Sequence, residues 1–418
     1  MSIYGNPEEY SDELRRIILC VKKLRALKPG HQTDWKSAAE CHMRYSNLHG
    51  KPALTLTITL SPTGCAWARK GGCTMCGEFE GSFKRTDLLD HPELHVAQFA
   101  ASVGDERVWQ VVNAERAPLE WIRIYQEGNY TNLNEVNIQS QEKILRLALR
   151  IKDVRRITIE SRPEYITNRS VAFLKRIFDG SGVELEIGMG LEAQDRVIRN
   201  ICINKQGSNE QFRRAVNLLA KNGFYSLAYV LLKPPFLSEK EAIVEAIKTI
   251  RFAADIGFSR ISFEPMSIHS YTLVDALAKS GIYRPPWLWS VVEVVKECHG
   301  VGGVLGIGGI GYYPLPVEYC RNRCEDEPAC SDAFTRAIIN WNVTRDIEAF
   351  SGLSCVCKRD WMISCEGNQL PLKARIGEQL TAVEGIINRN EYSPTTSGQS
   401  GSVARTRQRR LLMSYHQP

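Results

Sequence analysis

A Gly-rich loop that carries three cysteines constrains this chain more than any other stretch. Cys65, Cys73 and Cys76 stand in a C-x7-C-x2-C spacing directly after an alternating apolar run at residues 53–60. Three thiolates on one loop can hold three corners of a [4Fe–4S] cube and leave the fourth iron open to a small molecule. A zinc site would need a fourth Cys or His nearby, and the next candidate is His91. The spacing predicts a [4Fe–4S] cluster, and three thiols without a metal are the alternative.

The residues after this loop alternate short apolar strands with amphipathic helices. This rhythm is typical of a β/α series around a parallel sheet. Because no Rossmann fingerprint follows the first strand, we expect an α/β fold with a partial (β/α)6 TIM-like barrel; a doubly wound sheet is the alternative. The expected strands are 53–60, 121–125, 156–160, 184–188, 225–232 and 260–264, and the expected helices are 135–151, 170–178, 209–222, 239–256, 273–280 and 287–299.

Polar side chains follow one expected strand after another. The carboxyl ends of parallel strands meet at one edge of a barrel, so a single pocket would collect these groups. One glutamate after a strand is more often a helix cap or a solvated charge, but a succession of such ends indicates a site. The residues are Glu127 and Gly128, Glu160 and Arg162, Gly190 and Glu192, Lys233, and Glu264.

The cysteine loop followed by Gly77, together with Glu127-Gly128, resembles a radical S-adenosylmethionine (SAM) enzyme. The stretch at residues 159–166 resembles the third-strand motif of the subgroup that contains the elongator catalytic subunit. Within that subgroup, two Pro-Pro stretches at residues 231–239 and 283–290 resemble the RaSEA family, the radical SAM partner of archaeosine synthase. The C-terminal Cys355-Val-Cys357 followed by Trp361 also fits, so the resemblance covers roughly residues 50–365.

The resemblance implies that Cys65, Cys73 and Cys76 hold the cluster and that SAM chelates its open iron. An electron from the cluster would cleave SAM to methionine and a 5′-deoxyadenosyl radical, which would abstract a hydrogen from the substrate. Met75 stands where this superfamily commonly has an aromatic residue against adenine, and a thioether can make a similar contact. The remaining SAM-binding candidates are Gly77, Glu127 and Gly128 at the ammonium, Glu160, Arg162 at the carboxylate, and Glu192 near the ribose.

In RaSEA the substrate is a tRNA nucleoside whose 7-deazaguanine base carries a lysine, and the radical step breaks the lysine C–N bond to leave archaeosine. The resemblance therefore implies a tRNA-modifying C–N lyase, a partner enzyme that supplies the modified base, and a reductant such as ferredoxin or flavodoxin. Lys233 and Arg284 would meet the lysyl carboxylate or a phosphate. Trp287 or Trp289 would stack on a base, and core packing is the alternative for both tryptophans.

A second group of cysteines lies beyond the barrel. Thiolates in two short-spaced pairs about thirty residues apart suit a tetrahedral zinc ion. We expect the ligands to be Cys320, Cys324, Cys355 and Cys357. Cys330 or Cys365 can replace any of them, and a second cluster can replace zinc. Basic residues beside these ligands would give the module a surface suited to tRNA.

Two other functions remain open. One keeps the radical chemistry but acts on a free small molecule, such as a natural-product precursor or a nucleobase. The other is a non-catalytic cysteine-rich RNA-binding protein. Such a protein has no need for Glu127, Arg162 and Glu192 at successive strand ends, which favours an enzyme.

The composition is that of a globular protein. Thirteen cysteines in short-spaced clusters suit a reducing compartment, so we expect a cytoplasmic protein. No apolar run is long enough to span a membrane, and the net charge of +6 permits a polyanionic partner such as RNA. The expected organisation is a helical extension at 1–50, with a basic helix at 7–28 and a linker at 29–50, the barrel at 51–314, a cysteine-rich module at 315–390 and a disordered basic tail at 391–418.

Overall fold

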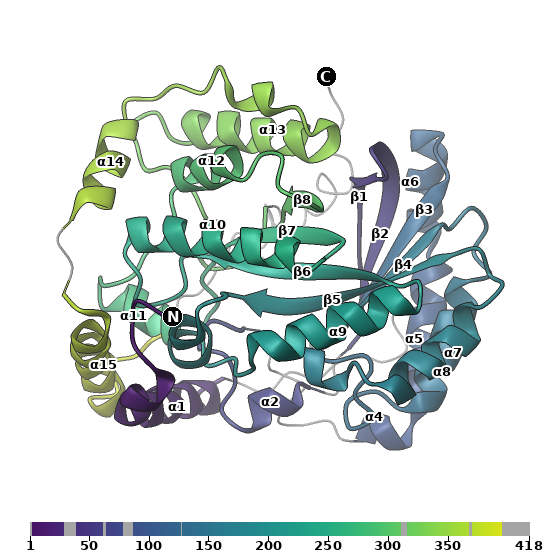
Figure 1. The fold of residues 1–418 in the computed structure, drawn as a ribbon, viewed down its shortest axis with the longest axis horizontal. Coiled ribbons are helices and arrows are strands. Elements are labelled where there is room, and N and C mark those ends of the chain that lie inside the picture. The colour runs from purple at the N-terminus through teal and green to yellow at the C-terminus, as the bar shows by residue number, and fades with distance from the viewer. Residues whose placement is uncertain are drawn as a thin grey trace.

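The computed structural model describes residues 2–28, 39–61, 64–77, 87–126, 128–310, 316–367 and 370–394. Its centre is an eight-stranded sheet whose strand order follows the chain from β1 to β8. β1 runs antiparallel to β2, and every later pair of neighbours is parallel. Doubly wound sheets reverse their strand order, so the sequential order confirms the predicted partial barrel. The sheet curls open, with helices on its outer face (Figure 1).

Most elements lie where the sequence predicts them. The strands are β1 (Glu40–Leu48), β2 (Lys51–Thr59), β3 (Leu119–Tyr125), β4 (Arg156–Glu160), β5 (Glu184–Glu192), β6 (Tyr225–Leu232), β7 (Arg260–Pro265) and β8 (Val304–Ile307). The α-helices are α1 (Ser11–Ala26), α2 (Ala66–Arg69), α4 (Asp87–Asp90), α5 (Pro92–Val103), α6 (Glu106–Glu115), α7 (Ile138–Ala148), α8 (Asn168–Phe178), α9 (Asn209–Lys221), α10 (Glu239–Asp255), α11 (Leu273–Lys279), α12 (Leu288–Glu297), α13 (Ala329–Thr344), α14 (Lys358–Glu366) and α15 (Leu372–Asn388). Short helical turns are η1 (Pro7–Tyr10), η2 (Pro163–Tyr165), η3 (Ile198–Cys202) and η4 (Ile347–Phe350).

Alternate residues of each strand face two different environments. Ile122 and Ile124 of β3 are fully buried in the main core, beneath the outer helices. Arg123, which lies between them, is also buried but bonds to Ser46 of β1 across the inner face of the sheet. The period of two along a strand therefore places apolar residues against the helices and polar residues in the interior of the half-barrel. We call this interior the lumen.

Two strands of the structure are absent from the sequence prediction. β1 lies in the segment that was expected to be a linker, and β8 lies beyond the last expected strand. In β1, only Met43, Asn47 and Leu48 are buried, so the strand presents little of the apolar alternation that identified the others. β8 is only four residues long and contains Gly306, and a strand of that length carries no detectable period.

Helix α13 spans the open side of the half-barrel. It contacts β1, β2 and β8, so it joins the two edges of the sheet. The Asn47 side chain of β1 donates to the Val343 carbonyl at 3.0 Å. At the other edge, the Asn342 amide accepts from the Ile307 N–H at 2.8 Å and donates to the Ile307 carbonyl at 2.7 Å. These bonds satisfy edge groups of the sheet that would otherwise stay open to pairing.

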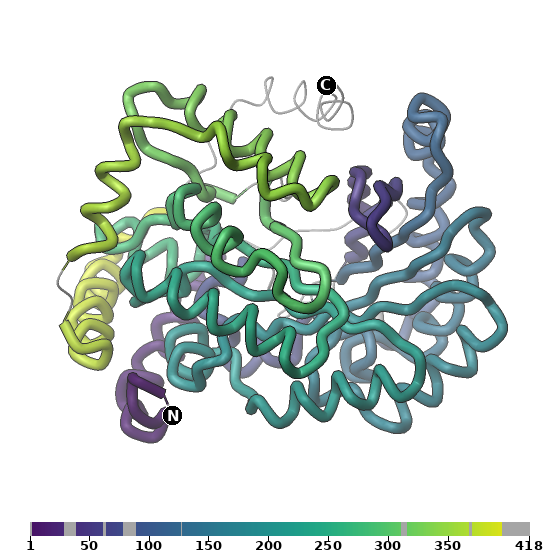
Figure 2. Tube along the Cα trace, turned by 45° about the horizontal axis from the view of Figure 1, so that its top comes forward, coloured from purple at the N-terminus to yellow at the C-terminus, as the bar shows by residue number. Residues whose placement is uncertain are grey.

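The two ends of the described chain pack together, because α1 lies beside α15 in both views of the molecule (Figure 2). Ile17 and Leu24 of α1 are fully buried. Arg16 reinforces the contact with two hydrogen bonds of 2.8 Å to the Glu384 carboxylate. In the part of the chain that the structure describes, every helix is too short or too polar to cross a bilayer. The domain boundaries at 50, 314 and 390 stay predictions, and residues 395–418 of the tail lie outside the described residues.

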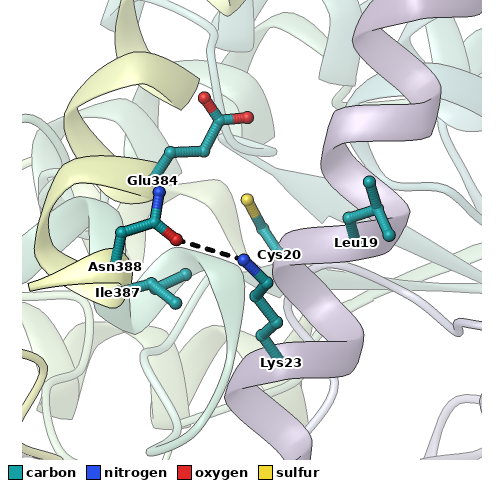
Figure 3. Close-up of a pocket in the computed structure, with 6 residues that line it drawn as sticks. All are labelled: Leu19, Cys20, Lys23, Glu384, Ile387 and Asn388. Carbon is teal, nitrogen blue, oxygen red and sulfur yellow. Dashed lines mark hydrogen bonds between the residues drawn. The ribbon is translucent and has the colours of Figure 1, made fainter. Parts of the chain in front are cut away.

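A shallow cavity of about 230 Å³ lies between α1 and α15 (Figure 3). Across it the Lys23 ammonium donates to the Asn388 side-chain oxygen at 3.1 Å. No strand end contributes to its wall, so it is a gap in helix packing rather than part of the site at the sheet edge. Its lining residues are Leu19, Cys20, Lys23, Glu384, Ile387 and Asn388.

The α1–α15 contact generates a stability prediction. Leu24→Ala removes a fully buried side chain and should lower the free energy of unfolding by about 2 to 5 kcal/mol. Leu19→Ala, on the exposed side of the same helix at 58% exposure, should change it by less than about 0.5 kcal/mol. Chemical denaturation of the two variants measures both values, and equal losses would contradict this packing.

Candidate active site

The cysteine loop follows β2 at the carboxyl edge of the parallel sheet, and α1 holds it from outside. The buried Arg25 guanidinium donates to the Ala68 carbonyl at 3.2 Å and to the Cys73 carbonyl at 3.0 Å. A Cβ on Gly72 would lie 2.2 Å from Arg25 Nη1, so only glycine admits this approach. One member of the basic face predicted for residues 7–28 is therefore used inside the protein.

The segment after β5 holds the opposite side of the loop. Thr74 donates its N–H to the Ile203 carbonyl at 2.9 Å. Asn204 donates its side-chain amide to the Gly72 carbonyl at 2.7 Å, and its own carbonyl accepts from the Trp67 indole at 2.7 Å. These bonds fix the loop against the segment after β5.

Glu135 joins this loop to the end of β3. Its fully buried carboxylate accepts from the Ala66 N–H at 3.0 Å, the Asn129 N–H at 2.5 Å, and the side-chain amides of Asn129 and Asn132 at 2.7 Å each. A Cβ on Gly128 would lie 2.4 Å from the same carboxylate. Sequence reasoning missed Glu135, although two asparagines and a glutamate at three-residue spacing before a helix were a visible signal.

The three loop cysteines suit a cluster better than a single ion. Burial, and then the Glu135 carboxylate, raise the pKa of the Cys65 thiol, whereas backbone hydrogen bonds from Ala68 and Trp67 act to lower it. Among the described residues, the loop cysteines are not part of any group of three or more possible ligands whose ligand atoms lie within 4.8 Å of one another. A [4Fe–4S] cube instead places each thiolate on a different iron.

The end of β3 offers an unsatisfied polar group beside the loop. Both amide atoms of Gln126, which is 2% exposed, lack a hydrogen-bond partner among the described residues. Buried amides of this kind are rare unless a ligand or water completes them. A polar cofactor at this strand end fits that observation. The predicted Glu127 lies outside the described residues, and Gly128 is the residue that packs on Glu135.

The ends of β4 and β5 bring two predicted residues, Arg162 and Glu192, to the same edge. Arg162 donates to the Glu164 carboxylate at 2.5 Å and to the Lys205 carbonyl at 2.9 Å, and its guanidinium lies 5.5 Å from the Trp67 ring centre. Glu192 pairs with the Lys205 ammonium at 2.8 Å. Burial lowers the pKa of Lys205, but Glu192 and Cys73 together outweigh burial and the net shift is upward.

Gly190 and Gly77 leave space for the side chains of Lys205 and His269, respectively. A Cβ on Gly190 would lie 2.1 Å from Lys205 Nζ, and one on Gly77 would lie 2.4 Å from the His269 Cβ. Burial, followed by the charge of Lys28, lowers the pKa of His269 to about 4, so the imidazole is neutral at pH 7. Met75 is half-buried and packs against the core.

Below this edge, the upper lumen contains tyrosines and carboxylates. The Tyr229 hydroxyl bonds to the Tyr125 hydroxyl at 3.2 Å and to the carboxylate of Glu160. Ser262 donates to the Glu264 carboxylate at 2.6 Å. Glu160, predicted to bind cofactor, is thus placed on the lumen side with Tyr229.

The floor of the lumen is a network of charges around a buried indole. Glu186 is fully buried and pairs with Arg260 at 2.6 Å and with Arg156 at 3.5 Å. Both guanidinium groups lie over the Trp121 ring, at 4.8 and 5.1 Å from its centre. Burial opposes ionisation of Glu186, but the arginines outweigh it and lower its pKa to about 2.

The predicted substrate residues Lys233 and Arg284 contact residues of α10 and the start of α12. The buried Lys233 ammonium pairs with the Glu239 carboxylate at 2.6 Å, and Glu239 also accepts from the Trp287 N–H at 2.9 Å and the Ser290 hydroxyl at 2.5 Å. The Arg284 guanidinium lies 4.0 Å from the centre of the Trp287 ring. These bonds connect β6, α10 and α12, so a packing role accounts for them. Trp287 and Trp289 are both buried in the core, as the alternative held.

Four C-terminal cysteines converge on one point. The sulfur atoms of Cys324, Cys330, Cys355 and Cys357 all lie within 4.8 Å of one another. Cys330 and Cys357 are 3.8 Å apart, and two N–H groups point at sulfur: Trp289 at Cys357 (3.3 Å) and Asn322 at Cys330 (3.4 Å). Burial raises the pKa of Cys324 and Cys330 to about 12, so without a metal these thiols stay protonated at pH 7.

This group corrects the predicted ligand set at one position. Cys330, at the start of α13, stands in the place expected for Cys320. Cys320 is buried instead beside Glu239, Arg284 and Lys233, whose charges act on its thiol. The C-x3-C spacing could not show whether Cys320 or Cys330 belongs to the group, because this depends on the path of the chain into α13.

No protein-family model matches the chain. Among curated proteins, archaeosine synthase subunit beta of Methanosarcina acetivorans is 29% identical over 318 residues, which cover 75% of this chain and 86% of that protein. The subunit of the same name from Thermococcus kodakarensis is 29% identical over 250 residues, 60% of this chain and 73% of that protein. The chain is similar to archaeosine synthase subunit beta.

This similarity confirms the resemblance that the motifs predicted. An uncharacterized Methanocaldococcus jannaschii protein, MJ0550, is 27% identical over 73% of this chain and 80% of its own length. Among solved structures, Elp3 of Methanocaldococcus infernus aligns with a TM-score of 0.42 and 16% identity, covering 63% of this chain and 60% of that chain. The coproporphyrinogen III oxidase HemN of Escherichia coli, a radical SAM enzyme, aligns with a TM-score of 0.32 and 14% identity, covering 50% and 42%.

The lumen floor generates a pH prediction. Because the folded pKa of Glu186 is about 2 and the unfolded value is about 4.3, the folded state binds fewer protons between these values. The stabilisation by this group is complete above about pH 4.3 and is lost as pH falls toward 2, by roughly 3 kcal/mol. Urea unfolding of Glu186→Gln at a series of pH values should show a flatter acid arm than wild type.

The matched control is Glu297→Gln, because that carboxylate is 56% exposed. It should keep the wild-type slope between pH 4.3 and 2. Parallel acid arms for wild type and Glu186→Gln would show that the arginines do not hold Glu186 ionised.

Proposed function

We propose that this protein is a radical SAM enzyme with a [4Fe–4S] cluster on Cys65, Cys73 and Cys76. The observation that carries the proposal is the attachment of the loop: its backbone is fixed by Arg25, Asn204 and Glu135 at the carboxyl edge of the sheet. This attachment holds the three cysteines at the edge where β/α barrels do their chemistry. The similarity to archaeosine synthase subunit beta supports the same assignment.

The neighbouring strand ends supply groups that suit SAM. When bound, the reduced cluster supplies the electron that cleaves SAM to a 5′-deoxyadenosyl radical. Arg162, held by Glu164 and the Lys205 carbonyl, would bind the SAM carboxylate. Glu192, fixed by Lys205, would accept from the ribose hydroxyls. Gln126 and Gly128 would line the amino-acid end, with Glu127 as the partner of the ammonium.

For the substrate, we propose a lysine-modified 7-deazaguanine nucleoside of tRNA, with cleavage of the lysine C–N bond. Support comes from the relatives, whose name is that of a subunit of archaeosine synthase. The name also supports a second subunit. We propose that this partner supplies the lysine-modified base. A reductant such as ferredoxin or flavodoxin would load the cluster.

SAM cleavage tests the proposal. Anaerobically reconstituted wild type should form 5′-deoxyadenosine from SAM and dithionite, and Cys76→Ala should lower the yield at least 100-fold because one corner of the cube loses its thiolate. Cys298→Ala, a buried cysteine on the outer helix layer, should keep wild-type yield. Liquid chromatography of the nucleoside product measures this, and wild type with a full iron load but no product would refute the proposal.

The second centre is proposed to hold one tetrahedral zinc ion on Cys324, Cys330, Cys355 and Cys357. A Zn–S bond of about 2.3 Å gives a tetrahedron edge of about 3.8 Å, and the Cys330–Cys357 sulfur separation is 3.8 Å. The N–H groups of Trp289 and Asn322 would stabilise the thiolate charge. A site with four protein ligands has no open position, so its role would be structural.

Metal analysis of two serine variants tests this set. Cys330→Ser should lower bound zinc at least tenfold relative to wild type under a competing chelator, because the ion keeps only three thiolates. Cys320→Ser, the cysteine that lies outside the group, should keep wild-type zinc. The reverse order of losses would restore the ligand set expected from sequence spacing.

A further inference from the structure

Some charged side chains of the lumen take no part in the ion pairs of its floor. On the floor, Glu186 is shared between Arg156 and Arg260. Arg123, between that floor and the candidate cofactor edge, forms no ion pair with a carboxylate among the described residues. Glu264, nearer the edge, likewise has no cationic partner in the described part of the chain. The lumen therefore contains a cation, Arg123, and an anion, Glu264, that are not paired with each other. A ligand that carries both charges would satisfy both residues.

Arg123 provides the cationic side. Its side chain is 4% exposed, yet its Nε has no hydrogen-bond partner in the described chain. Its Nη2 donates to the Ser46 hydroxyl at 3.1 Å, and the guanidinium lies 4.5 Å from the centre of the Trp121 ring. A buried guanidinium without a counter-ion is costly, and a planar fork suits a carboxylate. Arg44, exposed on β1, is close enough to act on the same groups.

Glu264 provides the anionic side. Its carboxylate accepts from Ser262 at 2.6 Å. A Cβ on Gly308 would lie 2.0 Å from it, so glycine at 308 keeps space for this carboxylate. Burial raises the pKa of Glu264, whereas Arg44 and Arg123 act to lower it, which places the three groups in one electrostatic neighbourhood.

We propose that the lumen binds the head group of an α-amino acid, with its carboxylate on Arg123 and its ammonium on Glu264. A lone anion such as phosphate would meet the Glu264 and Glu160 carboxylates, and a lone amine would meet Arg123 and Arg44. A zwitterion satisfies both sets at once. With its head group bound in this way, the rest of the ligand would point to the edge of the sheet that carries the cysteine loop. This inference makes the substrate class more specific and rests on the proposed function.

Calorimetric titration of the reconstituted full-length protein with simple ligands tests the site without any turnover. L-lysine carries both charges, cadaverine lacks the carboxylate, and 6-aminohexanoate lacks the α-ammonium. Lysine should bind at least tenfold more tightly than either analogue, since each analogue lacks one of the two hydrogen-bonded charges. Inorganic phosphate should not compete with lysine.

Two variants assign each charge. Arg123→Gln should lower lysine affinity to that of cadaverine, and Glu264→Gln should lower it to that of 6-aminohexanoate. Arg15→Gln, at an 80% exposed side chain on α1, is the matched control and should bind as wild type. If Arg123→Gln fails to fold by circular dichroism, the exposed Arg44→Gln replaces it, with an expected loss of about threefold to tenfold.

Equal affinity of wild type for the three ligands, displacement of lysine by phosphate, or unchanged lysine affinity in both folded variants would overturn the inference. The 5′-deoxyadenosine assay on the same preparations separates it from the proposed function. Lysine discrimination without SAM cleavage would refute the radical chemistry and keep the lumen site. SAM cleavage without lysine discrimination would refute the lumen site and keep the radical chemistry.

Discussion

The Glu135 carboxylate ties the cysteine loop to the end of β3, and the geometry of the candidate site depends on that tie. A buried carboxylate is costly unless hydrogen bonds replace its water. Here four N–H groups from Ala66, Asn129 and Asn132 do so. Because the donors come from both loops, the carboxylate fixes the loop relative to the neighbouring strand end. Gly128 follows from the same constraint, since a side chain there would collide with Glu135.

The charges of the lumen fall into two kinds. Glu186 with Arg156 and Arg260 is a closed network, in which each group has a partner of opposite charge. Removing one member of such a network would leave an unpaired charge in the low-dielectric interior. The role of this network is therefore to stabilise the fold. Arg123 and Glu264 belong to no such pair in the described chain. The free-energy cost of burying these unpaired groups is offset by other interactions of the fold, which is typical of groups that bind a ligand.

The repeating fold could be predicted because each buried strand carries its own apolar signal. β4 and β6 begin and end at the predicted residues, Arg156–Glu160 and Tyr225–Leu232. β1 could not be predicted from its period, because Arg44 and its neighbours on that face point away from the helix-packed core. The cysteine loop was evident from spacing alone. Arg25 was not, because its importance comes from contacts with Ala68 and Cys73, which are distant in the sequence. Glu135 had a local signal in Asn129 and Asn132, but its bond to Ala66 of the cysteine loop could not be read from the sequence.

The C-terminal cysteines connect metal binding to the closure of the half-barrel. Cys330 belongs to the first turn of α13, and the far end of α13 bonds to β1 and β8 through Val343 and Asn342. An ion held by Cys330 and by Cys355 and Cys357 would fix the start of this helix against the segment that leads into α14. Because structural metal sites contribute their binding energy to folding, the ion would stabilise the helix that spans the open side of the lumen. Under the proposed function the two cysteine groups would have separate tasks. One would place the reactive chemistry at the edge of the sheet, and the other would keep the lumen beneath it enclosed.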